Sequence, residues 1–231
     1  MHSNLRYKKH YQGDLPHYQP KESTVFITFR LDVPCPAEYF HLLKIKKNEI
    51  SNSIQHITKP QERNIMFQKK LFAIQDSFFD KYEHSGNFLL NRTCAQLMAT
   101  EIHHHNKVLY DLYAYTIMPN HIHLLIKPLH DETGQFYSLS KIMHLIKGRS
   151  SRFINLELKR SGKLWQDEYY DHYVRNETEL NNIIRYIILN PFKAGFVEQP
   201  KLWEWTWVIQ EFVSILDDDY MRESLEEYTI F

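Results

Sequence analysis

Two histidines separated by one residue, His121 and His123, are the clearest candidates for chemistry in this 231-residue chain. They lie in the segment MPNHIHLLI, whose apolar residues predict a β-strand over 121–127 after a tight turn at 119–120. Because side chains alternate along a strand, both imidazoles should point to one face, roughly 6–7 Å apart at the backbone. Such a pair can converge on one metal ion. A half-exposed strand with two histidines on its polar face fits the same pattern.

A second candidate group lies on a helix predicted over 176–190, which Asn176 caps and Pro191 is expected to end. The apolar stripe of this helix consists of Leu180, Ile183, Ile184, Ile187 and Ile188. Tyr186 lies roughly 130° from the centre of that stripe, and Asn190 follows it one turn later. A phenol and an amide oxygen would therefore be presented together, beside or opposite the core. A tyrosine packed under a loop is the alternative.

Three consecutive histidines, 103–105, follow a helix predicted from the Asn91 cap to about residue 104. Consecutive helical residues point about 100° apart, so these imidazoles are poorly placed to share a metal ion. At a helix C-terminus they can instead interact favourably with the helix dipole when charged.

The remaining hydrophobic patterns predict a mixture of strands and helices, which is an α+β protein. We expect strands over 24–31, 108–118 and 121–127, partly extended chain over 164–174, and helices over 37–45, 60–82, 91–104, 137–158 and 176–190. The tight turn between two strands requires antiparallel pairing. The predicted fold is therefore a ferredoxin-like antiparallel sheet with helices packed on it, with an extra helical insertion after the first strand.

Charge is balanced overall but uneven along the chain. Lys plus Arg and Asp plus Glu both number 28, which argues against indiscriminate binding of duplex DNA through the whole surface. The segment 141–163 holds seven basic residues and one acid, whereas 217–227 is strongly acidic. The basic segment is either a solvated helix face or a phosphate-binding surface.

Composition narrows the class of protein. Hydrophobic residues at 43% and charged residues at 24% are typical of a globular chain, and two cysteines cannot form a disulfide framework. We expect no signal peptide and no membrane span, and hence a cytoplasmic protein. The expected organisation is a disordered segment over 1–20, a single domain over 21–210 with a helical insertion at about 37–82, and an acidic tail over 211–231.

The motifs MPNHIHLLI and LWQDEYYDHYVRNETELNNIIRYIILNPFKAGFV together resemble the REP-associated tyrosine transposases. These belong to the single-tyrosine HUH transposase superfamily and are similar to insertion-sequence-200 transposases. The resemblance runs from about residue 89 to 207, with a weaker match at 24–31. Extra residues around 40–75 are absent from a minimal family member.

The resemblance implies a metal-dependent enzyme that nicks and joins single-stranded DNA. His121, His123 and Asn190 match the metal ligands, for Mg²⁺ or Mn²⁺, and Tyr186 matches the nucleophile. Attack by Tyr186 on phosphorus would leave a 5′-phosphotyrosine link and a free 3′-hydroxyl. Tyr169, Tyr170 and Tyr173, in the sequence EYYDHY, compete for the role of nucleophile, and Tyr170 is the preferred alternative among them.

The implied partner is single-stranded or hairpin DNA formed by repetitive extragenic palindromes, bound by a monomer or homodimer associated with the nucleoid. Basic grooves and stacking aromatics bind such strands, so the expected DNA contacts are Lys141, Lys147, Arg149, Arg152, Lys163 and Trp165. Two alternatives remain: a domesticated hairpin-binding protein that does not transpose, and a metal-binding regulator that uses histidines 103–105.

Overall fold

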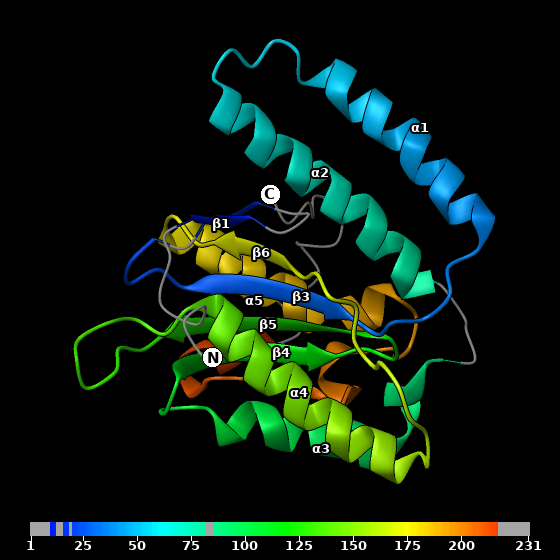
Figure 1. The fold of residues 1–231 in the computed structure, drawn as a ribbon, viewed down its shortest axis with the longest axis vertical. Helices are drawn as coiled ribbons and strands as arrows, with labels where there is room; N and C mark the ends of the chain where they lie inside the picture. Colours follow the sequence, from blue (N-terminus) through cyan, green and yellow to red (C-terminus); the bar gives the residue numbers. More distant parts are fainter. Residues whose placement is uncertain (1–9, 13–15, 19, 82–85, 217–231) are drawn as a thin grey trace. The chain divides into compact units, whose positions relative to one another are not determined.

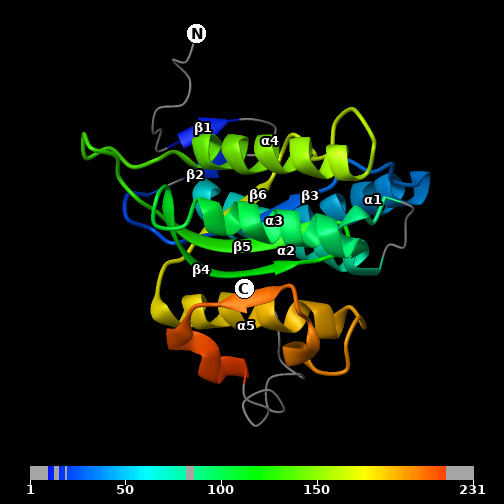
Figure 2. The ribbon, with the colours of Figure 1, turned by 90° about the horizontal axis from the view of Figure 1, so that it is seen from below.

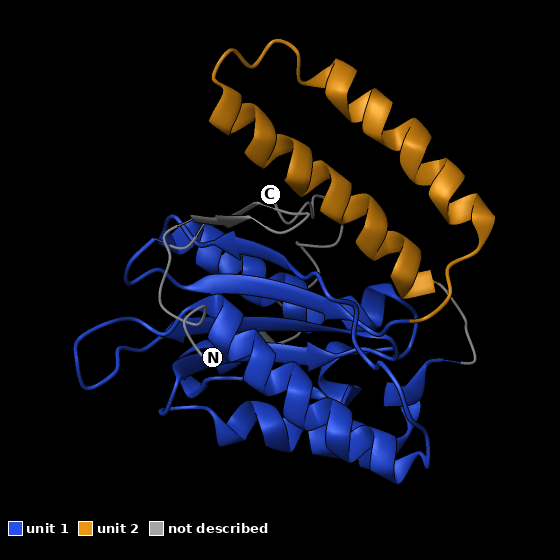
Figure 3. Ribbon diagram, in the orientation of Figure 1, with its two compact units in different colours: residues 1–32, 86–229 blue, residues 33–85, 230–231 orange. Residues whose placement is uncertain are grey.

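The structure, a computed structural model, describes residues 10–12, 16–18, 20–81 and 86–216. The chain divides into two compact units, which Figure 3 colours separately. The larger unit contains the chain up to Asp32 and again from Gly86 onward, and the smaller unit begins at Val33. No helix in the described part of the chain is both long and apolar enough to cross a membrane.

The larger unit is built on a five-stranded antiparallel sheet (Figure 1). In sheet order its strands are β6 (Tyr170–Tyr173), β3 (Val25–Arg30), β5 (His121–Pro128), β4 (Tyr110–Ile117) and β7 (Thr206–Val208). Helix α3 (Arg92–His104) precedes β4, and α4 (Leu139–Glu157) joins β5 to β6. This β-α-β-β-α-β order with neighbours β6-β3-β5-β4 is the ferredoxin-like arrangement, and it confirms the predicted fold class.

The two faces of the sheet carry different chemistry because side chains alternate along each strand. On β5, Ile122, Leu124 and Ile126 are fully buried on one face. Trp165 packs edge-on against Phe29 of this face and donates a hydrogen bond to α4, which places α4 on the same side. Figure 2 shows α5 (Glu177–Lys193) on the opposite side of the sheet from α4. The face carrying the histidines is therefore the one that α5 covers.

The smaller unit is a pair of helices, α1 (Ala37–Ser53) and α2 (Pro60–Lys81). Its own core contains Ile50 and Ile54 packed with Leu71. Helix α1 runs eight residues beyond the expected end at residue 45. Its polar second half, which carries little apolar signal, stays helical because Ile50 is buried in this core.

Shorter elements complete the chain: β1 (His10–Gln12), β2 (Pro16–Tyr18), and the 3₁₀ turns η1 (Phe88–Leu90), η2 (Pro200–Leu202) and η3 (Gln210–Leu216). Strands β1 and β2 pair antiparallel. Residues 1–9, 13–15, 19 and 217–231 lie outside the described part of the chain. The predicted disorder, the acidic tail and the domain limits therefore stay predictions.

The end of α5 differs from the expectation. Pro191 lies inside the helix, which continues to Lys193. A proline this close to the C-terminus removes only one donor, and the next N–H groups still bond, from Ala194 to the Asn190 carbonyl and from Gly195 to the Phe192 carbonyl. The helix stops where Gly195 adopts a φ of +80°, a conformation that glycine enters without steric cost.

We predict that Asn176→Ala lowers the free energy of unfolding by about 1 kcal/mol, because α5 then loses its N-cap. The Asn176 side chain accepts a hydrogen bond from the Glu179 N–H at 2.8 Å. Urea denaturation would measure the loss. Asn176→Asp, which keeps an acceptor oxygen, should stay within a few tenths of a kcal/mol of the wild type; an equal loss in both variants would contradict the capping explanation.

Candidate active site

His121 and His123 lie at the start of β5, directly after the Pro119-Asn120 turn, and both are fully buried. Their side chains share one face of the sheet, as the alternation predicted. The Nε2 atoms of the two rings face each other at 3.1 Å. The strand thus brings two imidazole nitrogens to one point.

Neighbouring side chains fix the orientation of both rings. The Asn120 side-chain oxygen lies 2.6 Å from His121 Nδ1 and can only accept, so His121 carries its proton on Nδ1. Thr28 of β3 lies directly opposite His123, and its hydroxyl is 2.7 Å from His123 Nδ1. With both Nδ1 atoms engaged, the two Nε2 atoms are the ones that face each other.

Burial lowers the pKa of both imidazoles well below the ordinary histidine value, and the positive charge of Arg30 acts in the same direction. For His121, proximity to His123 adds to this shift. Both rings are therefore neutral near pH 7, the state in which imidazole nitrogens bind metal ions.

The pair fits the geometry of a divalent metal site. Imidazole nitrogens bind metals at roughly 2.0–2.1 Å, so two adjacent ligands at a right angle would be about 3.0 Å apart. The observed 3.1 Å between the Nε2 atoms is close to that value. The side-chain oxygen of Asn190 is buried and has no hydrogen-bond partner among the described residues, and such an orphaned acceptor suits a hard cation.

Tyr186 meets the histidines from α5. Its ring contacts the His123 ring with centroids 5.1 Å apart, and it meets Phe26 edge-on at 5.9 Å. The side chain is 8% exposed, although it lies off the apolar stripe of the helix. It is buried because it faces the histidine-bearing side of the sheet. Asn190 follows it one helical turn later, as the spacing predicted.

The competing tyrosines have other surroundings. Tyr170 of β6 pairs with Thr28 and meets the Phe26 ring edge-on at 6.3 Å, which places it on the edge of the histidine face. Tyr173 stacks on His172. Tyr169 lies under the ammonium of Lys147. Tyr170 therefore remains the competing nucleophile, and Tyr186 has the direct ring contact with His123.

The histidines at the end of α3 do not converge. His105 Nε2 is 2.8 Å from a Glu101 carboxylate oxygen, while His103 contacts the Tyr115 hydroxyl at 3.3 Å. Burial lowers the pKa of both imidazoles. The different partners agree with the expectation that consecutive helical residues point apart.

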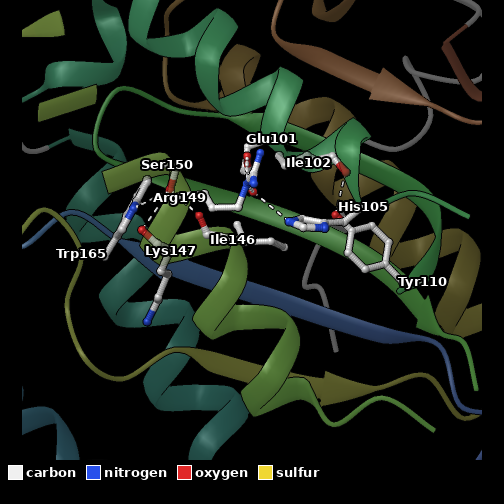
Figure 4. Close-up of polar contacts among 9 residues, drawn as sticks. All are labelled: Glu101, Ile102, His105, Tyr110, Ile146, Lys147, Arg149, Ser150 and Trp165. Atoms are coloured by element: carbon white, nitrogen blue, oxygen red, sulfur yellow. Dashed lines mark hydrogen bonds and ion pairs between the residues drawn. The ribbon is translucent and has the colours of Figure 1, made fainter. Parts of the chain in front are cut away.

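Several of the expected DNA contacts take part in bonds within the fold, as Figure 4 shows. Arg149 Nε donates to both Glu101 carboxylate oxygens, at 3.0 and 3.1 Å. Lys147 donates to the backbone carbonyls of residues 166, 167 and 168 at 2.9, 2.9 and 3.5 Å, and burial lowers its pKa to about 8. Trp165 is 4% exposed and donates to the Ser150 hydroxyl at 2.9 Å.

The remaining three lie nearer the surface. Lys141 lies over the Tyr137 ring, Lys163 bonds the exposed Asp167 carboxylate at 2.9 Å, and Arg152 is exposed on α4. All six of the expected DNA contacts are on α4 or the segment that follows it. Contact with DNA stays a prediction for each of them.

An ionic cluster around the buried Glu179 ties β6 to the first turn of α5. A Glu179 carboxylate oxygen lies 2.9 Å from His172 Nε2 and 2.7 Å from an Arg175 guanidinium nitrogen. Burial alone would raise the pKa of this carboxyl, but the hydrogen bonds from His172 and Arg175 outweigh it and hold the pKa well below its usual range. The cluster fixes the start of the helix that carries Tyr186.

Sequence reasoning missed the residues that orient the histidines. Thr28 and Phe26 belong to a strand almost 100 positions earlier, and nothing in the sequence specifies the register that sets Thr28 against His123. Asn120 was interpreted only as a turn residue, although its position directly before His121 was a usable signal. Arg30, opposite His121 in the same register, was also missed.

Comparisons with known proteins match the part of the chain that holds these residues. Residues 87–190 match the sequence profile of the family described as "Transposase IS200 like". That range includes His121, His123 and Tyr186, and it ends at Asn190. Residues 87–190 are therefore similar to the IS200-like transposases.

Two individual proteins are similar to the chain. A Haemophilus influenzae protein named as a REP-associated tyrosine transposase is 29% identical to it over 102 residues, which is 42% of this chain. The chain covers 58% of the length of that relative. The solved structure of a REP-associated tyrosine transposase bound to a REP hairpin superimposes with a TM-score of 0.44 and 15% identity, over 84% of this chain and 82% of that one.

We predict that Thr28→Val weakens Mn²⁺ binding about 10- to 100-fold, because groups that orient a ligating histidine contribute that much to metal affinity. Valine keeps the shape of threonine and removes only the hydroxyl that holds His123. Isothermal titration calorimetry would measure the affinity. Thr116→Val is the control, since the Thr116 hydroxyl contacts Thr206 at 2.7 Å instead; a similar loss in both variants would refute a specific role for Thr28.

We predict that Glu179→Gln destabilises the protein by about 2 kcal/mol at pH 7 through the loss of charged hydrogen bonds. Because the folded-state pKa is depressed, this stabilisation is present above the unfolded value of about 4.3 and fades as the pH falls below it. The difference in urea midpoint between wild type and variant should therefore narrow below about pH 4.5. Glu177→Gln, exposed in the same turn, should show little difference at any pH.

Proposed function

We propose that this protein is a metal-dependent enzyme that nicks and joins single-stranded DNA through a covalent 5′-phosphotyrosine intermediate. Tyr186 is the nucleophile, and His121, His123 and Asn190 hold the divalent metal ion. The substrate is DNA with hairpin-forming repeats, as the resemblance to REP-associated tyrosine transposases implies, and the Haemophilus influenzae relative carries that family name.

The observation that carries the proposal is that the histidine pair of β5 and the Tyr186 ring of α5 lie in contact, although they are far apart in the sequence. The Nε2 atoms of His121 and His123 lie 3.1 Å apart, and the ring of Tyr186 packs against His123. A nucleophilic hydroxyl and a metal-binding pair on one face of a sheet are what phosphodiester transfer requires. The match to the IS200-like transposases over 87–190 supports the same chemistry.

The protein's own groups prepare the reaction. Asn120 and Thr28 hold the imidazoles by their Nδ1 atoms, so both Nε2 atoms face the same point. Phe26 packs against both His123 and Tyr186, which keeps the phenol beside the histidines. A bound divalent ion would supply charge stabilisation for the scissile phosphate. Imidazole ligands favour Mn²⁺ and the amide oxygen suits either Mn²⁺ or Mg²⁺.

The covalent step is a transesterification. The phenolic oxygen of Tyr186 forms a bond to phosphorus as the bond from phosphorus to the 3′-oxygen breaks. The phenol gives up its proton, and the leaving 3′-oxygen takes one up to become a hydroxyl. Since one phosphoester replaces another, the 3′-hydroxyl of a second DNA end can reverse the step and join the strands.

An adduct assay tests this function. The protein is incubated with Mn²⁺ or Mg²⁺ and labelled single-stranded oligonucleotides covering the DNA that flanks its own gene, and then run on a denaturing gel. We expect a labelled band at the mass of protein plus DNA. The band should be absent in Tyr186→Phe, which lacks the nucleophile, and reduced at least about 100-fold in His121→Ala, which lacks a metal ligand. The band should also disappear when the metal is chelated.

Tyr170→Phe is the matched control because Tyr170 lies at the edge of the same face. It should leave the adduct intact. An adduct that survives Tyr186→Phe and is lost in Tyr170→Phe would reassign the nucleophile. Selective hairpin binding without any adduct would replace the proposed enzyme with a DNA-binding protein.

A further inference from the structure

A cavity of about 400 Å³ lies between α4 and the segment 162–169 of the larger unit. Lys147 and Gly148 lie on its helical side, with Ser140, His144 and Ser151 along the same helix. This volume falls within the usual range of ligand pockets, about 300–1,000 Å³. None of the four proposed catalytic and metal-binding residues lines it.

Apolar and polar side chains both line this cavity. Met143 and Leu164 are each 2% exposed and Trp165 is 4% exposed, so these lining side chains are fixed by the packing around them. Hydroxyl and amide groups of Ser140, Ser151 and Gln166 provide hydrogen-bonding edges. A lining that mixes apolar and hydrogen-bonding groups suits a flat ring that carries donors and acceptors at its edge.

The charges in the cavity indicate that the ligand is neutral. The three donors of the Lys147 ammonium already bond three backbone carbonyls, and Lys163 is bonded to Asp167 at 2.9 Å and lies 3.5 Å from Asp32. The cations of the wall are therefore engaged, and a carboxylate accompanies them. A phosphate group would find little uncompensated positive charge here, whereas a nucleobase needs none.

The cavity also lies beside the strand that borders the candidate active site. The backbone N–H of Gln166 donates a hydrogen bond to the Arg30 carbonyl at 2.9 Å, and Trp165 forms an isolated antiparallel β-bridge with Leu31. The same segment continues into β6, whose Tyr170 pairs with Thr28. Trp165 packs on the α4 face of the sheet, whereas Thr28 bonds His123 on the α5 face. A DNA strand that crosses this edge of the sheet can reach both places.

We propose that the cavity holds one unstacked base of the single-stranded DNA substrate, with its neutral ring between α4 and the segment 162–169. This inference rests on the proposed function and extends it by naming a base-binding subsite. Proteins that bind single strands commonly take individual bases into such pockets.

Gly148 allows the cavity to be filled without disturbing the fold. A Cβ atom added at Gly148 would meet nothing within 4 Å, and the residue lies in the helix at an exposed position. Gly148→Leu should therefore occupy the cavity with a side chain, while Gly148→Ala adds one methyl group and leaves most of the volume open. Both substitutions favour the helix, so any loss of binding does not come from unfolding.

The test uses fluorescence-labelled dA12, dC12 and dT12 oligonucleotides and a twelve-unit abasic strand as probes. Wild-type protein should bind at least one base-bearing strand about 10-fold or more tightly than the abasic strand, because base contacts of this kind contribute on that order. Gly148→Leu should lose that preference while its affinity for the abasic strand stays unchanged. Gly148→Ala should retain most of the preference.

Equal affinities of Gly148→Leu and wild type for every strand would overturn the subsite. So would a Gly148→Leu variant that loses affinity for the abasic strand as well, since that result points to backbone contacts. The proposed chemistry is tested separately by the Tyr186 adduct. If Gly148→Leu forms the adduct and binds the oligonucleotides with unchanged affinity, the base-binding subsite is refuted and the proposed enzyme activity is still supported.

Discussion

His123 can turn Nε2 toward His121 because Thr28, directly opposite it on β3, engages its Nδ1. This contact depends on the register between two strands that are far apart in sequence. A slip of one residue would move Thr28 and Phe26 to the other face of the sheet and leave His123 without its partner. The ring orientation, the contact with Phe26 and the approach of Tyr186 all depend on that register.

Burying two imidazoles side by side is costly if they are charged, and the structure avoids this cost by keeping them neutral. Desolvation and the nearby Arg30 charge lower the pKa of both rings. Neutral rings provide lone pairs, and an oriented pair of lone pairs is the basis of a metal site. The same physical effect thus protects the core and prepares the chemistry.

Helix α5 is the second essential element because it carries both Tyr186 and Asn190. Its first turn is held by Asn176 and by the ionic cluster of Glu179 with His172 of β6. Its last turn passes through Pro191 and ends at Gly195. Fixing the helix at both ends restricts the rotation and sliding that would carry the phenol away from His123.

The periodic features of the sequence predicted local structure well. The alternation in HIHLLI placed His121 and His123 on one face, and the caps at Asn91 and Asn176 marked two helix starts correctly. The neighbours that side chains meet from elsewhere in the chain could not be predicted. Trp165 was expected to contact DNA, which stays a prediction, and the structure adds that its indole is 4% exposed and donates to the Ser150 hydroxyl of α4.

The sequence by itself therefore determined the element types, the shared face of the two histidines and the spacing of Tyr186 from Asn190. These features follow from strand and helix periodicity, which are properties of the local backbone. Only the tertiary structure decided that Thr28 and Asn120 orient the imidazoles and that Tyr186 packs on His123. Those contacts join segments whose relative register and packing arise from burying the whole core, so no short stretch of sequence encodes them.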